Sequence, residues 1–303
     1  MKHIKEIVEN VKGKAEIALT SGMKFLEENM GPLYPGELTL ICGEVNNGKS
    51  ALMIQQIHRM AIDNKVPVLV VLSGKDEKAF LACMAAYYCS IVVKDVHRVL
   101  TDPLYKDVIQ SYMELIQQSP IYFISRNEFW QIESELSEFV IEKGIKTIFV
   151  ERLLWLCMDS MKQRQLAIRL KELIIDLQVA MIAEFNIWQN EDYPPLSIEQ
   201  LERDDIAIFA DNIIGIIDFQ QHRVFEDEKG NDLRGKVRMK IMKHNGMLAR
   251  EKEIVFPRIQ LLVRDIHNTI CLGGDCNDLF ADNSSMNRLR HELDFEVQDY
   301  FNF

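Results

Sequence analysis

The feature that most constrains this chain is the octapeptide GEVNNGKS at residues 43–50. It matches the phosphate-binding loop pattern GxxxxGK[ST] at every fixed position. An apolar run precedes it at residues 37–42, and residues 51–57 after it have the composition of a helix. A strand, a loop and a helix in this order form the context in which the pattern binds nucleotides. The sequence therefore predicts a nucleoside triphosphate site here, rather than a chance match in a turn.

Each part of this loop has a chemical task. Glycines at both ends let backbone N–H groups curve around phosphate oxygens, and the N-terminus of the next helix adds the positive end of its dipole. We expect Lys49 to reach the β- and γ-phosphates and the Ser50 hydroxyl to ligate Mg²⁺. ATP and Mg²⁺ are thus the predicted cofactors, and the predicted nucleotide-binding residues are Gly43, Glu44, Val45, Asn46, Asn47, Gly48, Lys49, Ser50 and Ala51.

Length and composition indicate a globular protein. The chain has 303 residues, of which 48% are hydrophobic and 27% charged, so it can bury a full core. We find no apolar run of about 20 residues and no signal-like N-terminus, and the six cysteines are scattered, several of them in apolar segments. These features predict a cytoplasmic protein with no membrane partner. Cys271 and Cys276 lack a second pair to complete a zinc site.

The charge distribution bears on nucleic-acid binding. The formal net charge of −11 argues against non-specific coating of nucleic acid, which needs a basic surface. Much of the acidic excess lies in residues 275–299, so a basic strip elsewhere on the molecule remains compatible with the composition. Net charge weakens the nucleic-acid interpretation without excluding it.

Apolar strands that alternate with helices predict an α/β fold with a mostly parallel sheet covered by helices on both faces. A later stretch with little helix predicts antiparallel strands at one edge. Helices are predicted at residues 77–88, 104–118, 129–143 and 162–177, and strands at 37–42, 66–72, 121–124, 147–150, 179–183, 213–219, 236–243 and 259–263. The predicted domains are a linker or docking helix (1–20), an ATPase domain (21–270) and an acidic tail or peripheral helix (271–303).

A second acid is needed near the Mg²⁺ for phosphoryl transfer from ATP. The candidate is Glu151, which follows the apolar strand 147–150. Parallel strands deliver such acids to the carboxyl edge of a sheet, beside the phosphate loop. The alternative is a solvated glutamate at a strand end. We therefore predict that Ser50 and Glu151 share the metal.

The chain resembles the RecA-like ATPase domain of the DnaB family of hexameric replicative helicases over roughly residues 20–265. The phosphate loop is the specific match, and the other segments support it through their order and spacing. These segments are Thr20-Ser21-Gly22, GPLYPGEL (31–38), ERLLWL (151–156), LKEL (170–173), Ala210-Asp211 and KHNG (243–246).

The resemblance also assigns roles at which this sequence departs from the family. A glutamate that polarises the attacking water follows the second strand in the family, whereas Ser73-Gly74 stand here, with Asp76 and Glu77 shortly after as candidate substitutes. Glu184 stands where the family has a sensor glutamine. His244 stands where the family has an arginine that acts in trans on the neighbouring subunit. Lys49, Glu151, Glu77, Glu184 and His244 are therefore the candidate catalytic residues.

Two functions remain open on this basis. The first is a DnaB-like ATPase, an ATP hydrolase that assembles with itself into a hexameric ring and couples hydrolysis to movement on single-stranded DNA in replication. The second is a catalytically weakened ATP-binding regulator, loader or accessory subunit of such a ring, with replication or loader proteins as partners. A small-molecule kinase is a third interpretation, but a strand-final glutamate and late edge strands fit the RecA-like core better.

Overall fold

The computed structural model of the chain describes residues 23–73, 77–88, 101, 103, 106–125, 129–156, 162–187 and 205–257. The chain divides into two units, Met1–His267 and Asn268–Phe303, and all described residues belong to the first. The predicted helix within 1–20, the predicted strand at 259–263 and the predicted tail at 271–303 lie outside the described residues. No helix in the described ranges has the length and apolarity needed to cross a membrane.

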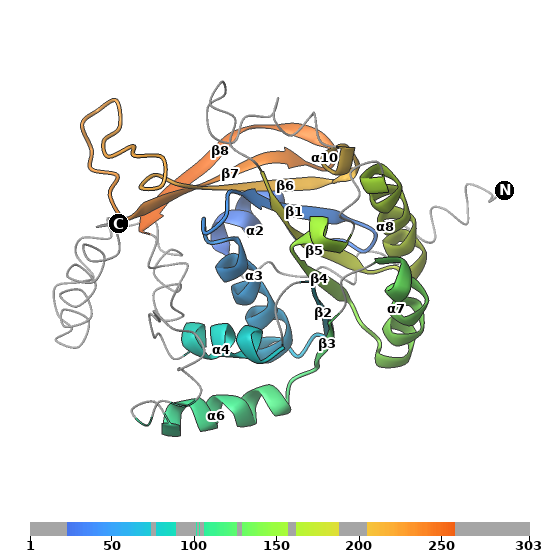
Figure 1. Cartoon of the computed structure of the whole chain (residues 1–303). Helices are drawn as coiled ribbons and strands as arrows, with labels where there is room; N and C mark the ends of the chain where they lie inside the picture. The colour runs from blue at the N-terminus through green and yellow to red at the C-terminus, as the bar shows by residue number, and fades with distance from the viewer. Residues whose placement is uncertain are drawn as a thin grey trace. The chain divides into compact units, whose positions relative to one another are not determined.

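An eight-stranded sheet forms the centre of the first unit, with the strand order β3-β2-β4-β5-β1-β6-β7-β8 (Figure 1). The strands from β3 to β6 are parallel to one another, and β7 and β8 are added antiparallel at one edge. Their bounds are β1 Leu38–Gly43, β2 Val68–Leu72, β3 Ile121–Ser125, β4 Thr147–Glu151, β5 Ala180–Asn186, β6 Asn212–Asp218, β7 Lys236–His244 and β8 Met247–Pro257.

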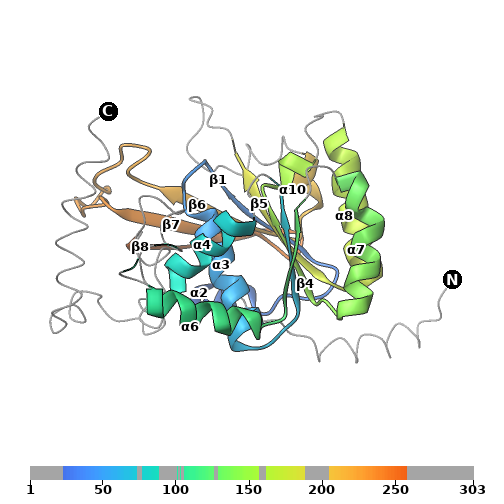
Figure 2. The same cartoon turned by 60° about the horizontal axis from the view of Figure 1, so that its bottom comes forward.

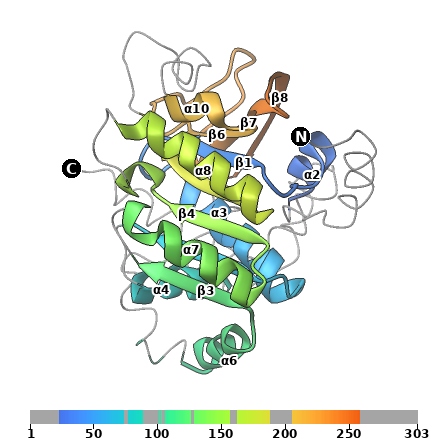
Figure 3. The same cartoon turned by 90° about the vertical axis from the view of Figure 1, so that its right-hand side faces the viewer.

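Helices cover both faces of the parallel part (Figures 2 and 3). One face carries α3 (Lys49–Ile57), which continues into the π-helical turn η1 (His58–Asp63), together with α4 (Glu77–Tyr88) and α6 (Lys106–Gln117). The other face carries α7 (Phe129–Lys143) and α8 (Gln163–Leu177). The remaining elements are short: α2 (Lys24–Met30), the 3₁₀ turn η3 (Leu153–Leu156) and α10 (Asp205–Phe209). The predicted α/β class with antiparallel edge strands is confirmed.

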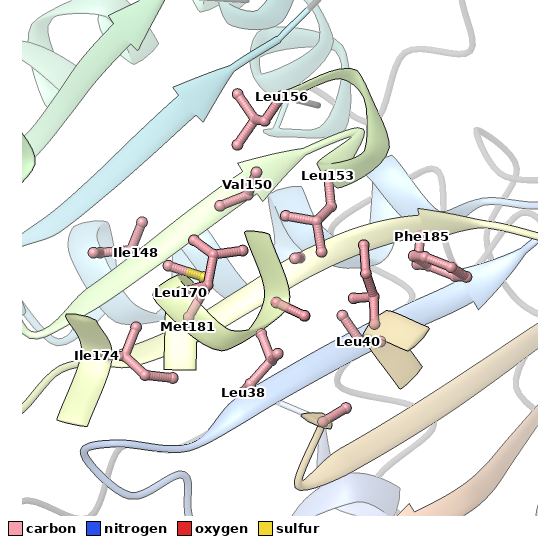
Figure 4. Close-up of a cluster of buried hydrophobic side chains, with 14 of the residues drawn as sticks. Leu38, Leu40, Ile148, Val150, Leu153, Leu156, Leu170, Ile174, Met181 and Phe185 are labelled. Atoms are coloured by element: carbon pink, nitrogen blue, oxygen red, sulfur yellow. The ribbon is translucent and has the colours of Figure 1, made fainter. Parts of the chain in front are cut away.

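The core between the sheet and the α7–α8 layer is mostly aliphatic (Figure 4). Successive side chains of a strand point to opposite faces, so alternate residues of β1, β4 and β5 enter this core. Burying each large aliphatic side chain contributes about 1.5–3 kcal/mol. The strand residues in this core include Leu38, Leu40, Cys42, Ile148, Val150, Met181, Ala183 and Phe185, and α8 adds Leu170 and Ile174.

The same alternation decides which face receives the polar residues at the carboxyl edge. Val150 and Phe185 face the α7–α8 core. Glu151 and Glu184, each one position away from these residues, therefore face the α3 side. Both glutamates are buried, being 0% and 3% exposed. The sheet thus delivers two acids to the layer that begins with the phosphate loop.

Candidate nucleotide site

The loop between β1 and α3 has a backbone that only certain residues adopt readily. Gly48, directly before α3, lies in the left-handed region with φ 92°, where a side chain would be strained. Asn46 also has a positive φ of 67°, and asparagine is among the residues that tolerate this region. The second glycine of the motif is therefore required by backbone conformation.

Gly43, the first glycine of the motif, is required for a different reason. A Cβ atom at this position would lie 2.6 Å from the carbonyl oxygen of Ile216 on the neighbouring strand β6. The same carbonyl accepts a 3.2 Å hydrogen bond from Asn47 Nδ2. The close approach of β1 to β6 thus anchors the loop at its start.

Residues after β6 hold the outer part of the loop. Gln221 Nε2 donates a 3.2 Å hydrogen bond to the carbonyl of Val45, and His222 Nε2 lies 3.7 Å from a carboxylate oxygen of Glu44. The loop motif does not point to these residues, because only the pairing of β1 with β6 brings residues 216–222 to the loop. No local signal in the sequence indicates that pairing.

Lys49 is buried, with 5% of its surface exposed. Burial lowers the pKa of its ammonium below the usual 10.5, because desolvation disfavours the charged form. Nearby Glu184, then Cys42 and Glu44, act in the opposite direction, and the Arg152 guanidinium lowers the pKa further. The ammonium also donates a hydrogen bond to the carbonyl of Glu44. A bound phosphate would stabilise the charged form of this lysine.

Glu151 is the last residue of β4 and lies two strands from β1, because β5 alone separates β4 from β1. At a strand spacing of about 4.8 Å, the two strand ends are about 10 Å apart. The hydroxyl of Ser73, directly after the adjacent β2, shares its one hydrogen between the Glu151 carbonyl and the Arg152 carbonyl, the latter at 3.0 Å. Arg152 Nε lies 3.7 Å from Glu151 Oε1.

Glu184 is close enough to Lys49 to influence its pKa. The strand that carries Glu184 is longer than the sequence predicts. β5 does not end at this residue but runs on to Asn186, because it pairs with β1 as far as Gly43. Glu184 itself is in register with Ile41 of β1. It thus lies between the phosphate-loop strand and the strand that carries Glu151.

Glu77 and His244 lie away from the loop of their own chain. Glu77 accepts a hydrogen bond from Ser125, at the end of the edge strand β3, about 20 Å across the sheet from β1. His244 lies at the tip of the β7–β8 hairpin, and its Nδ1 atom is 3.0 Å from the side-chain oxygen of Asn212. Asn212 pairs with Thr39 near the start of β1, so this tip lies at the amino edge of the sheet.

A divalent cation fits the chemistry of the carboxyl edge of the sheet, where Glu151 and the phosphate loop lie. Mg²⁺ is usually bound through one or two carboxylates together with phosphate oxygens and waters. Ser50, in the first turn of α3, and Glu151 would hold it. Within the described residues, no three histidine, cysteine or acidic side chains form a cluster that could hold a metal ion. The phosphate oxygens of a nucleotide would therefore supply part of the coordination.

A phosphate loop between the central strand and first core helix of a mostly parallel sheet, with acids on neighbouring strands, defines the RecA-like class of phosphate-loop NTPase folds. Among solved structures, one described as an ATPase domain matches with a TM-score of 0.70 and 18% identity, covering 84% of this chain and 95% of that chain. "The Structure Of A DnaB-Like Replicative Helicase And Its Interactions With Primase" matches with a TM-score of 0.67 and 17% identity, covering 84% and 65%, respectively.

Residues 18–249 match the model of the DnaB-like helicase C-terminal domain. The chain therefore belongs to this family, and the family resemblance seen in its motifs is confirmed. Among curated proteins, no sequence matches the chain. At 17–18% identity, the structural matches establish the fold only.

Proposed function

We propose that this chain binds ATP with Mg²⁺ on residues 43–51 and hydrolyses it, coupling hydrolysis to single-stranded DNA binding or translocation in replication. One observation carries the proposal. The buried Lys49 at the start of α3 shares one face of the sheet with the buried Glu151 and Glu184. A cationic phosphate ligand beside acids suited to metal and water is the arrangement that phosphoryl transfer requires. Family membership supports the coupling to DNA.

A nucleotide-binding subunit with weak hydrolysis is a second candidate, favoured by a specific observation. The residues that stand where the family resemblance implies catalytic groups make hydrogen bonds elsewhere in their own chain. The Ser73 hydroxyl contacts the carbonyls of Glu151 and Arg152. Both ring nitrogens of His244 lie within 3.1 Å of asparagine side chains, those of Asn212 and Asn245. Such a protein would bind ATP as a regulator, loader or accessory subunit of a ring.

The test is ATP binding and turnover by the full-length chain, each measured with and without single-stranded DNA. The expected result is ATP binding that Lys49→Ala abolishes, together with turnover that DNA stimulates. Arg169→Ala, on the solvent side of α8 and 50% exposed, is the control and should behave like the parent chain. Tight binding with negligible turnover would select the second candidate. Failure of the parent chain to bind ATP would refute both.

A further inference from the structure

Arg152 is a residue at the candidate site to which neither the loop motif nor the family resemblance assigns a role. It follows Glu151 directly and has a left-handed backbone with φ 52°. This region is unfavourable for a residue with a long side chain, and such outliers persist where the surrounding structure enforces them. The Ser73 hydroxyl, at the end of the adjacent strand β2, lies 3.0 Å from the Arg152 carbonyl and also contacts the Glu151 carbonyl, so this backbone is held against β2.

The consequence is the direction in which the guanidinium points. In an extended strand, residue 152 would face the opposite side of the sheet from Glu151. Instead, Arg152 Nε lies 3.7 Å from Glu151 Oε1, so the cation shares the face of Glu151, Glu184 and Lys49. About a third of the Arg152 side chain is exposed, whereas Glu151 is fully buried. The guanidinium therefore has access to the solvent side of the candidate metal ligand.

Arg152 also lies at the level of the phosphate loop. Val150 pairs with Ala183, and Ala183 with Leu40, so Glu151 lies level with Ile41 of β1, and Arg152 follows it at the strand end, near the start of the loop at Gly43. The electrostatic influence of Arg152 on Lys49 agrees with this placement. Two cations, Lys49 and Arg152, thus lie near the two buried acids Glu151 and Glu184.

The cations near the hairpin tip are placed differently. Lys243 Nζ donates to the Ala207 and Ile208 carbonyls, at 3.4 and 3.0 Å, and the His244 ring lies between two asparagine amides. These residues lie at the amino edge of the sheet, away from the loop of their own chain. Among the described residues, a second positive charge for the γ-phosphate, in addition to Lys49, would therefore come from a second copy of the chain or from another residue near the loop.

We infer that Arg152 is that residue: a catalytic arginine that contacts the γ-phosphate of ATP in the same chain. This inference rests on the proposed function. If Glu151 held the metal, this carboxylate would be occupied by the ion, and the Arg152 guanidinium would be free to turn to a γ-phosphate oxygen. The oxygen of water forms a bond to the γ-phosphorus, and the bond to the β–γ bridging oxygen breaks with its electron pair passing to ADP. The products are ADP, hydrogen phosphate and a proton released to solvent, and Arg152 stabilises the charge on the transferring group.

The test compares Arg152→Gln and Arg152→Lys with the parent chain and with the control Arg169→Ala. Arg152→Gln is expected to lower kcat by about 10³-fold or more, because arginines that contact the transferring phosphate contribute about 10³–10⁵ in kcat. It should change the affinity for ADP by less than about threefold. Arg152→Lys is expected to restore only part of the turnover rate, since an ammonium cannot reproduce the bidentate hydrogen bonding of a guanidinium to phosphate oxygens. Circular dichroism melting checks that each variant is folded.

A mixing experiment distinguishes action in the same chain from action on a neighbour. Arg152→Gln chains are mixed with Lys49→Ala chains under assembling conditions. If Arg152 acts within its own chain, every site in the mixture lacks one essential group and turnover stays at the level of the separate variants. Recovery of turnover would overturn the inference, because it would mean that a Lys49→Ala chain can lend its arginine to a neighbour.

Binding data keep this inference separable from the proposed function. The parent chain should prefer ATP, or ADP with aluminium fluoride, over ADP alone, and Arg152→Gln should lose this preference even if turnover is too slow to measure. Suppose that the parent chain binds ATP and that Arg152→Gln keeps both the turnover rate and the preference for ATP over ADP. This result would refute the role of Arg152 but leave the proposed function standing. A parent chain that binds no nucleotide refutes the proposed function and, with it, this inference.

Discussion

At the scale of single residues, the molecule keeps several ionisable groups in environments that disfavour their charge. Lys49 is buried beside the phosphate loop, and Glu37, just before β1, is half-buried at the opposite edge of the sheet. Burial of a charge costs stability unless partners replace the lost water. At Lys49 a bound phosphate would be such a partner. At Glu37 the partners are the Tyr34 N–H and the Asn212 amide, at 3.1 and 3.4 Å.

The environment of Glu37 predicts a pH-dependent effect on stability. Desolvation raises the pKa of this carboxyl above 4.5, against the hydrogen bond from the Tyr34 N–H, and Asp211 raises it further. A raised pKa in the folded state means that the stabilising contribution is present at low pH and is lost as pH rises through the folded pKa. Glu37→Gln should therefore increase the free energy of unfolding at pH 7 by roughly 0.5 kcal/mol. Below pH 4.5 this difference from the parent chain should vanish.

Urea unfolding of both chains at pH 7 and at pH 4 measures this effect. Glu228→Gln, at an exposed position, is the matched control for removing one negative charge. A gain that is equal at both pH values would contradict the electrostatic explanation and would indicate a packing effect.

At the scale of elements, the contact between β1 and β6 holds the candidate nucleotide loop. The Ile216 carbonyl excludes a side chain at position 43 and bonds to Asn47, and the turn after β6 bonds to Val45. The loop is thus supported on one side by a neighbouring strand rather than only by its own glycines. Its shape should depend on how closely these two strands approach.

Gly43→Ala tests this support. The added Cβ atom would lie 2.6 Å from a backbone carbonyl that cannot move aside without shifting β6. We expect a loss of about 1–3 kcal/mol in the free energy of unfolding, as in other overpacked sites, together with a loss of ATP affinity. Gly230→Ala is the control, because this glycine has open space around it but a positive φ of 79°. It should lower stability while leaving ATP affinity, measured by titration calorimetry, unchanged.

At the scale of the whole molecule, the candidate site and the β7–β8 hairpin tip lie at opposite edges of the sheet. The tip contacts the start of β6 through His244, Asn245 and Gly246, and β6 begins level with Thr39 of β1. Four residues of strand, about 13 Å, separate Thr39 from Gly43. A group on this tip can therefore reach a nucleotide only in a second copy of the chain.

His244→Ala should consequently leave the ATP affinity of a single chain unchanged. The measurement is a titration with a fluorescent ATP analogue at concentrations below and above those at which light scattering detects assembly. A loss of affinity confined to the assembled protein would indicate a contribution in trans. A loss at the lowest concentrations would contradict the separation described here. Lys49→Ala, which should abolish binding at every concentration, is the reference.

Much of the architecture could be predicted from local pattern. The helices at residues 77–88 and 129–143 were predicted with the bounds of α4 and α7. The phosphate loop was likewise predicted between the correct elements. Strand β8 was missed, since the charged run 250–253 hides its pattern and its extended state depends on pairing with β7.

The amino-acid sequence by itself determined the loop, the elements around it and the strand end that carries Glu151, because glycine spacing and apolar periodicity are local properties. Only the tertiary structure decided which groups meet. The strand order places Ile216 and Gln221 against the loop. It places Glu77 beside Ser125 and His244 at the amino ends of the parallel strands. The backbone at Arg152 places its guanidinium beside Glu151. These neighbours come from segments far apart in the chain or from one strained backbone angle. Their proximity follows from the packing of the whole sheet, which no short stretch of sequence encodes.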